Sequence, residues 1–273
     1  MTLSNLQPRE RVRAALAFRK TDRPPRDFAA VPEIWAALGR HFGTMDQHAI
    51  LRRLGVDCRI VSYDSFCRHP AVPEVDMNAS AERSSTGGMW RRVEADGSNR
   101  DIWGAHRRKA ANAFGAFDEL VSYPLAGAET AADVGAYGWP QPDWWDFSGL
   151  PAVMAGLNAE AEYSIRYRIG SVYETAWSLT GLEKFQMDLL LNPEVPAAIM
   201  ERITDVHVAN LKRALDVAGD AIDIVYFYDD VASQQSLLVS PETYDQSIAP
   251  HHRRLIETAA AYGKPAMMHC CGA

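Results

Sequence analysis

The chain has 273 residues, of which 47% are apolar and 23% are charged, and its formal net charge is −7. This composition is typical of a globular protein and excludes disordered, collagen-like and coiled-coil chains. The acidic balance lacks the basic surface that nucleic-acid binding requires, and no stretch approaches the roughly 18 apolar residues of a membrane span. We therefore expect a protein that acts on a small-molecule substrate and binds neither nucleic acid nor a membrane. We interpret the short basic runs at 107–109 and 251–254 as solvated faces.

The number and spacing of the cysteines indicate the redox conditions of the compartment in which the protein is expected to lie. The chain contains Cys58, Cys67, Cys270 and Cys271. A disulfide-stabilised secreted fold has a much higher density of cysteines, and adjacent cysteines are poor partners for each other. Residues 1–13 also lack the apolar segment of a signal peptide. These features predict a reducing, cytoplasmic location, where grouped histidines and cysteines indicate metal binding or catalysis.

The first half of the chain mixes helical and extended patterns. In chain order these predict helices at 7–20, 34–42 and 47–54 and strands at 26–30 and 56–62. Ser4 or Asn5 is a suitable cap for the first helix, and Pro24 ends it.

The middle of the chain contains turn residues and aromatic residues. Asp96-Gly97 separates the β-like runs 89–93 and 101–103, which predicts a hairpin. Residues 124–151 are rich in proline, glycine and tryptophan, and we interpret them as an ordered, aromatic-packed connection.

The second half alternates strands and helices more regularly. The patterns predict strands at 163–169, 221–228 and 264–269 and helices at 181–191, 193–218 and 240–262. Pro250 is expected to kink or divide the last helix. Strands separated by helices indicate parallel pairing with right-handed crossovers, as in a β/α barrel or an open doubly wound sheet. No G-x-G-x-x-G follows an early strand, which disfavours a dinucleotide-binding fold.

The end of the last predicted strand contains a candidate metal site. His269 and Cys271 are two residues apart, so in an extended strand their side chains point to the same side. Zinc accepts this pair of imidazole and thiolate ligands, but a catalytic zinc needs three protein ligands. The alternative is that His269 is a core histidine and that Cys270 and Cys271 are small buried residues.

Carboxylates follow two other strands. Asp229 and Asp230 come directly after the apolar run 221–228, where parallel α/β folds place their sites, and we slightly favour Asp229 as the functional group. Burial and mutual repulsion can leave one of them an acid beside a base, whereas the alternative is loop solvation and capping. Glu174, with Trp177 nearby, either lines the same mouth or is an exposed acid in the first turn of a helix.

Taken in order, these segments resemble the uroporphyrinogen decarboxylase-like superfamily, which includes zinc- and corrinoid-dependent methyltransferases. The matching pieces are Arg9-Glu10-Arg11-Val12, Asp22-Arg23-Pro24-Pro25, Asp101 with Trp103-Gly104, Pro124-Leu125-Ala126, Gly138-Trp139-Pro140, Gly181-Leu182-Glu183, Asn192-Pro193-Glu194, Asp229-Asp230 with Gln235, Ser240-Pro241-Glu242 and His269-x-Cys271-Gly272. The resemblance implies one domain over residues 1–273, a (β/α)8 TIM-type barrel with a hairpin and Trp/Pro-rich connection at about 85–150. Its site lies at the carboxyl ends of the strands.

The resemblance also implies a chemistry. In the methyltransferase branch, His269 and Cys271 correspond to two zinc ligands, and a cysteine much further along supplies the third. The zinc holds a substrate thiol as thiolate, which takes a methyl group from a corrinoid on a partner protein. Asp229 and Asp230 are then candidate catalytic residues, and the expected substrate contacts are Glu174, Trp177 and Gln235.

Two departures from the family pattern leave alternatives open. The stretch 28–43 contains only Arg40 where true decarboxylases carry an Arg-rich signature, and those enzymes have a tyrosine near Trp177. The alternative function is a cofactor-free tetrapyrrole decarboxylase, in which Asp229 or Asp230 polarises a pyrrole N–H.

The second departure concerns length. The sequence stops directly after the His-x-Cys-Gly segment, so we expect a barrel that is incomplete at this end, with Cys58 or Cys67 as substitutes for the missing ligand. An inactive fragment or binding module is the third alternative.

Overall fold

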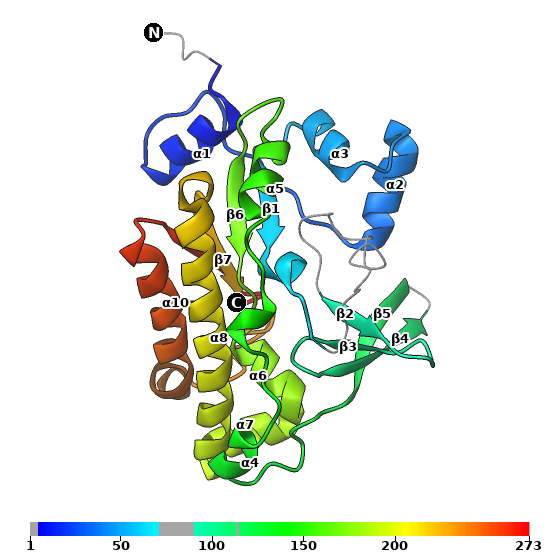
Figure 1. The fold of residues 1–273 in the computed structure, drawn as a ribbon, viewed down its shortest axis with the longest axis vertical. Coiled ribbons are helices and arrows are strands. Elements are labelled where there is room, and N and C mark those ends of the chain that lie inside the picture. Colours follow the sequence, from blue (N-terminus) through cyan, green and yellow to red (C-terminus); the bar gives the residue numbers. More distant parts are fainter. Residues whose placement is uncertain (1–4, 71–89, 113–114, 273) are drawn as a thin grey trace.

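The computed structural model describes residues 5–70, 90–112 and 115–272. A parallel sheet of four strands runs through the centre in the order β1-β6-β7-β8, and Figure 1 shows it beside a four-stranded antiparallel sheet. The parallel strands are β1 (Cys58–Ser62), β6 (Ser164–Arg168), β7 (Ile224–Tyr228) and β8 (Ala266–His269). All three pairings are parallel, as the alternation of strands and helices predicted. This is an α/β fold, and closure of these strands into an eight-stranded barrel stays a prediction.

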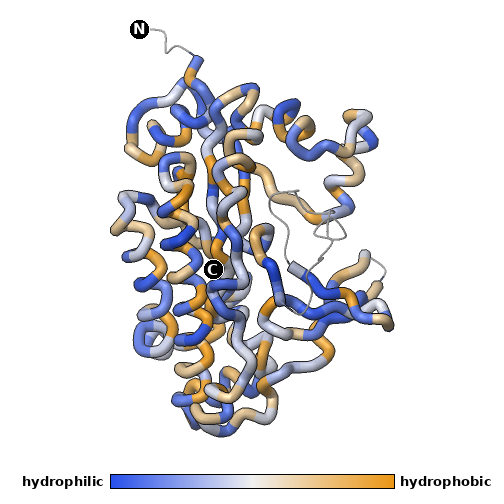
Figure 2. The backbone as a smooth tube through the Cα atoms, viewed as in Figure 1, coloured by the Kyte–Doolittle hydropathy of each residue, from blue (hydrophilic) through white to orange (hydrophobic). Residues whose placement is uncertain are grey.

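Helices connect the parallel strands. They are α5 (Leu150–Leu157) before β6; α6 (Tyr173–Thr180), α7 (Leu182–Leu191) and α8 (Glu194–Ala218) between β6 and β7; and α9 (Pro241–Thr243) and α10 (Ala249–Ala261) between β7 and β8. Helix α8 packs against α10, and its residues alternate between hydrophobic and hydrophilic along its length (Figures 1 and 2). The buried side includes Ile199, Ile203 and Leu211 at helical spacing. Every helix in the described ranges is too short or too polar to cross a bilayer.

The helix predicted at 240–262 is divided near Pro250, as one of the two alternatives had it. A π-helical turn, Tyr244–Ile248, lies directly before α10, and Pro250 occupies the first turn of that helix. A proline is tolerated there because its missing N–H has no partner within the helix.

The amino-terminal helices are α1 (Pro8–Leu16), α2 (Pro32–Phe42) and α3 (Gln47–Arg53). The predicted cap Asn5 is wrong, and Ser4 lies outside the described residues. Gln7 precedes α1, and its N–H donates to Glu10 at 3.0 Å. The predicted strand at 26–30 is also wrong. The Arg26 carbonyl oxygen accepts the N–H of Asp57 at 2.9 Å, but among the described residues this segment forms no ladder with β1 or another strand.

Buried ion pairs attach this region to the sheet. Asp57 is fully buried immediately before β1, and it accepts hydrogen bonds from Arg11 at 2.6 Å and from Arg23 at 2.7 Å. The early Arg and Asp motifs therefore stabilise the amino end of the sheet, opposite the edge at which we predicted the site.

The antiparallel sheet contains β2 (Arg91–Val93), β3 (Asn99–Asp101), β4 (His106–Asn112) and β5 (Gly115–Ser122). The pairing of β2 with β3 confirms the predicted hairpin in its described part, and position 89 lies outside the described residues. The sequence patterns missed β4 and β5, because most of their side chains are solvent-exposed and lack an apolar alternation.

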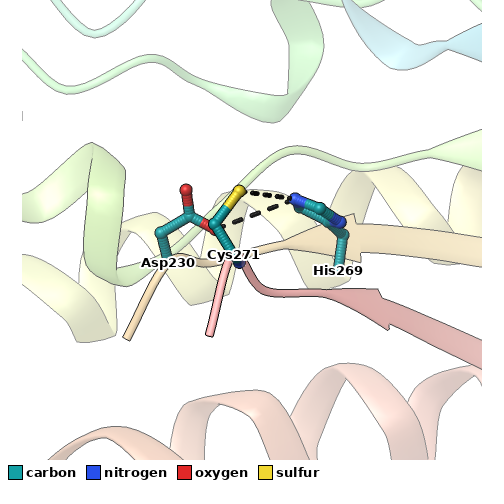
Figure 3. Close-up of side chains that lie close together, drawn as sticks. All are labelled: Asp230, His269 and Cys271. Atoms are coloured by element: carbon teal, nitrogen blue, oxygen red, sulfur yellow. Dashed lines mark hydrogen bonds and ion pairs between the residues drawn. The ribbon is translucent and has the colours of Figure 1, made fainter. Parts of the chain in front are cut away.

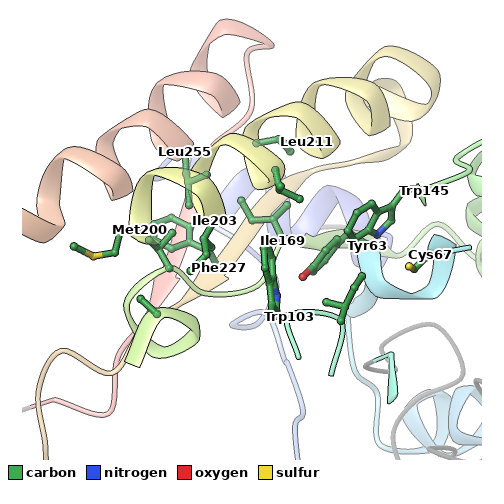
Figure 4. Close-up of a cluster of buried hydrophobic side chains, with 14 of the residues drawn as sticks. Tyr63, Cys67, Trp103, Trp145, Ile169, Met200, Ile203, Leu211, Phe227 and Leu255 are labelled. Atoms are coloured by element: carbon green, nitrogen blue, oxygen red, sulfur yellow. The ribbon is translucent and has the colours of Figure 1, made fainter. Parts of the chain in front are cut away.

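The main hydrophobic core fills the space between the parallel sheet and the helices that cover it (Figure 4). Phe227 of β7 and Ile203 of α8 lie in the same cluster as Trp103 of the antiparallel region. Trp139 and Trp145 are buried in it too, which confirms that the Trp-rich connection is ordered and packed.

Candidate metal centre and adjoining cavity

Three residues with metal-binding side chains meet at the carboxyl ends of β7 and β8. The parallel register pairs Tyr228 with His269, so the residues that follow the two strands lie at one edge. His269 Nε2 lies 3.2 Å from Cys271 Sγ and 3.9 Å from Asp230 Oδ1, and all three ligand atoms lie within 4.8 Å of one another. Figure 3 shows the side chains converging. We call Asp230, His269 and Cys271 the ligand cluster.

The chemistry of the ligand cluster fits zinc. Ligand atoms bound at about 2.0–2.3 Å around one tetrahedral ion lie roughly 3–4 Å apart, close to the spacings observed here. One imidazole, one thiol and one carboxylate are all zinc ligands, and a catalytic zinc uses three protein ligands with an open position. The side chains of His269 and Asp230 are 50% and 38% exposed, and Cys271 is also exposed, so the ligand cluster is accessible from solvent.

Without a cation, the ligand cluster favours a protonated thiol. The pKa of Cys271 is raised, because Asp230 accepts a hydrogen bond from the thiol and its negative charge opposes the thiolate. Asp230 also accepts a hydrogen bond from the Cys271 N–H at 2.6 Å. A bound dication reverses this preference, since it stabilises the thiolate and the carboxylate together.

The adjacent aspartates have different surroundings. Asp229 is fully buried, whereas Asp230 is partly exposed in the ligand cluster. Asp229 accepts hydrogen bonds from the N–H groups of Val172 at 2.9 Å and Glu174 at 2.8 Å, and from His252 Nε2 at 2.7 Å. These contacts suit an anchor for the polypeptide chain better than a group that meets substrate. A catalytic role for Asp229 stays a prediction.

Glu174 connects the ligand cluster with a cavity. It lies in the first turn of α6 and is partly buried, so the alternative of an exposed acid is wrong. Its Oε1 accepts the N–H of Asp230 at 2.8 Å. Burial and the negative charges of Asp229 and Asp230 raise the pKa of Glu174 to about 7, although the hydrogen bond from Asp230 opposes the shift. Glu174 can therefore exchange a proton near neutral pH.

The cavity has a volume of about 110 Å³. It lies beyond the carboxyl ends of β1, β6 and β7, and the antiparallel sheet and α6 border it. Its lining includes Asp64, Trp90, Trp103, Arg107, Arg168, Gly170, Glu174, Trp177 and Tyr228. Glu174 and Trp177 both line this cavity, whereas neither Asp229 nor any member of the ligand cluster is among its lining residues. Their expected place in one mouth with Asp229 and Asp230 stays a prediction. Gln235 does not line the cavity, because it is exposed in a turn in which its N–H donates to Ser233 Oγ at 3.2 Å.

Sequence reasoning missed Asp64. This residue is buried two positions after β1, at the same edge as the other candidates, and burial raises its pKa to about 6. Its Oδ1 has no hydrogen-bond partner among the described residues. The signal in the sequence was that Asp64 lies two positions after the strand predicted at 56–62, as the other candidate carboxylates follow their strands.

Sequence reasoning also missed His252. The run 251–254 was interpreted as a solvated face, which is wrong for its two histidines, because His251 and His252 are both buried. All four residues of this run are polar, so the sequence does not show which of them face the core. Packing of α10 against α8 and β7 decides this.

Neither Cys58 nor Cys67, the expected substitutes for a third ligand, joins the ligand cluster. Cys58 begins β1 at the opposite edge of the sheet, and burial raises the pKa of its thiol to about 12. Cys67 is buried beside Trp145. Within the described ranges, Asp230 is the third member of the ligand cluster.

The fold and the site together define an α/β protein with a candidate metal centre at the carboxyl edge of its parallel sheet. Residues 162–273 match the family model of uroporphyrinogen decarboxylase (URO-D), which confirms the resemblance to this superfamily over the segment that contains the ligand cluster. Among solved structures, the chain is similar to a methyltransferase from Methanosarcina mazei, with a TM-score of 0.56 and 14% identity. The similarity covers 98% of this chain and 70% of that one. No curated protein sequence matches.

Proposed function

We propose that this protein is a zinc-dependent methyltransferase of the URO-D-like superfamily. It moves a methyl group between a corrinoid, carried by a partner protein, and a thiol or related small acceptor. The observation that carries the proposal is the convergence of Asp230, His269 and Cys271 within 4.8 Å. The shared fold with a methyltransferase supports it at the level of architecture.

His269, Cys271 and Asp230 would hold the zinc. Bound zinc lowers the pKa of a coordinated thiol and so supplies a thiolate nucleophile at neutral pH. Three protein ligands leave one position of a tetrahedral site for the substrate sulfur.

Residues around the ligand cluster position its main chain and line the adjoining cavity. Glu174 fixes the main chain of Asp230 and can exchange a proton at its other carboxylate oxygen, since its pKa is about 7. Trp177 lines the adjoining cavity beside Glu174. The small cavity volume suits a small acceptor.

The name of the matching family favours a second candidate, decarboxylation of a tetrapyrrole. A polycarboxylate substrate requires several free cationic contacts. Arg40 is exposed on α2 and is not among the residues that line the cavity. The two arginines of the lining are already engaged, because Arg107 pairs with Asp101 at 2.5 Å and Arg168 donates to Ser62 Oγ at 3.3 Å. These observations favour the methyltransferase.

Metal analysis and two activity assays test the proposal. We expect about one zinc per chain after purification from zinc-supplemented cells, and loss of zinc in His269→Ala and Cys271→Ser. Cys270→Ser is the matched control, because Cys270 is adjacent but outside the ligand cluster. Methylation of a small thiol with methylcobalamin as donor should require the zinc. Unchanged zinc in both ligand variants overturns the proposal, and turnover of uroporphyrinogen by metal-stripped protein establishes the decarboxylase instead.

A further inference from the structure

A continuous set of hydrogen bonds joins the exposed ligand cluster to the protein interior. We propose that His252, on α10, is a positioning residue for the ligand cluster. It orients Asp229, and Asp229 holds the segments that carry Glu174 and His269. The expected effect on metal affinity rests on the proposed function. His252 itself contacts none of the three ligand residues.

The first link is a buried pair. His252 Nε2 lies 2.7 Å from Asp229 Oδ2, and the two side chains are 3% and 0% exposed. An ionised carboxylate only accepts hydrogen bonds, so the imidazole donates from Nε2. Tyr244 Oη lies 3.2 Å from Nδ1. The imidazole is therefore held at both ring nitrogens, which fixes its orientation toward Asp229.

The second link makes Asp229 a hub between three segments. Its two carboxylate oxygens accept the N–H groups of Val172 and Glu174, which fixes the start of α6. Its own N–H donates to the carbonyl oxygen of His269 at 3.0 Å, which fixes the end of β8. Asp229, which follows β7, thus joins the start of α6 to the end of β8, two parts of the chain that are distant in sequence.

The third link reaches the ligand cluster. Glu174 Oε1 accepts the N–H of Asp230 at 2.8 Å, and Asp230 Oδ1 accepts the N–H of Cys271 at 2.6 Å. These contacts are all short and run through main-chain groups, so a rotation of the Asp229 carboxylate is transmitted to the positions of the ligand atoms. Outer partners of this kind commonly change metal affinity by about 10- to 100-fold.

His251 provides a matched control. It precedes His252 on α10 and is also buried, but its Nδ1 lies 3.0 Å from Thr204 Oγ1 on α8, away from the ligand cluster. Replacing either histidine with leucine removes a buried imidazole. Only the replacement of His252 removes a donor to Asp229.

The experiment titrates the full chain with Co²⁺ and follows the thiolate-to-cobalt absorption band. His252→Leu should weaken Co²⁺ affinity by about tenfold, whereas His251→Leu should change it less than about twofold. His252→Gln keeps an N–H donor and should recover much of the loss. Wild-type affinity in His252→Leu, or equal weakening in His251→Leu at a matched loss of melting temperature, overturns the inference. If His252→Leu does not fold, Tyr244→Phe decides: we expect a loss of about two- to fivefold, and unchanged affinity overturns the inference.

Hydrogen exchange of the metal-free protein separates this inference from the proposed function. Peptides containing residues 172–174, 230 and 271 should exchange faster in His252→Leu than in His251→Leu, because their N–H groups lose fixed acceptors. A wild-type chain that binds no Co²⁺ contradicts the metal site, while the exchange rates still decide whether His252 orders the cluster. Equal exchange in both variants overturns the positioning role.

Discussion

The Nε2 atom of His269 lies 3.2 Å from the Sγ atom of Cys271, two residues further along the chain. Alternation along an extended segment explains this contact, because residues i and i+2 share a side. Asp230 comes from a different strand and joins the pair only because β7 and β8 are neighbours in register. The resulting ligand set makes specific predictions about thiol chemistry, metal binding and stability.

The first prediction concerns the reactivity of Cys271. In metal-free protein, Asp230→Asn should lower the pKa of the Cys271 thiol, because the substitution removes the negative charge that opposes the thiolate. The pH midpoint of alkylation by iodoacetamide, measured in a Cys270→Ser background, should therefore move down. Cys58 and Cys67 are buried and should react slowly. A midpoint that does not move means that Asp230 does not set the thiol pKa.

The second prediction concerns the contact between Glu174 and Asp230. Glu174→Ala removes the acceptor of the Asp230 N–H and should weaken zinc affinity by about tenfold, whereas Glu174→Gln retains an acceptor oxygen and should weaken it much less. Competition with a zinc indicator measures both affinities. Equal affinities in the two variants would show that Asp230 needs no support from α6.

The third prediction concerns Asp64 and pH. The pKa of Asp64 is raised to about 6 in the folded protein by burial, so the folded state binds its proton more tightly than the unfolded state. This contribution to stability is fully present below the unfolded pKa of about 4 and is lost as the pH rises through 6. Relative to Asp64→Asn, the wild-type free energy of unfolding should therefore fall by about 2–3 kcal/mol across this window. Urea denaturation at pH 3.5 and pH 7 measures it, and parallel pH profiles would contradict the assignment.

The fourth prediction concerns the ion pairs at the amino edge of the sheet. Asp57→Ala leaves Arg11 and Arg23 without their fully buried partner and should reduce the free energy of unfolding by about 3–5 kcal/mol. Arg19→Ala, at an exposed position, should change it by less than about 0.5 kcal/mol. Urea denaturation at constant pH compares the two variants. A loss below about 1 kcal/mol in Asp57→Ala would mean that the ion pairs add little to stability.

The local elements of the second half were predictable because each has a strong local cause. Residues 221–228 form an apolar, β-branched and aromatic run, and the structure places β7 within it. Ser240 accepts the N–H of Thr243 at 3.0 Å, as its position before Pro241 indicated. The segment at 26–30 also has an extended pattern, but a strand needs a neighbour, which local sequence does not specify.

By itself, the sequence determined the alternation of strands and helices, the placement of His269 and Cys271 on one side, and the location of carboxylates after strands. Those features depend on periodicity and on the few residues around each element. Only the tertiary structure decided that Asp230 joins the histidine and cysteine while Asp229 turns inward to His252. Strand register and helix packing make that choice, because they join residues 23 to 41 positions apart through hydrogen bonds that no local pattern records.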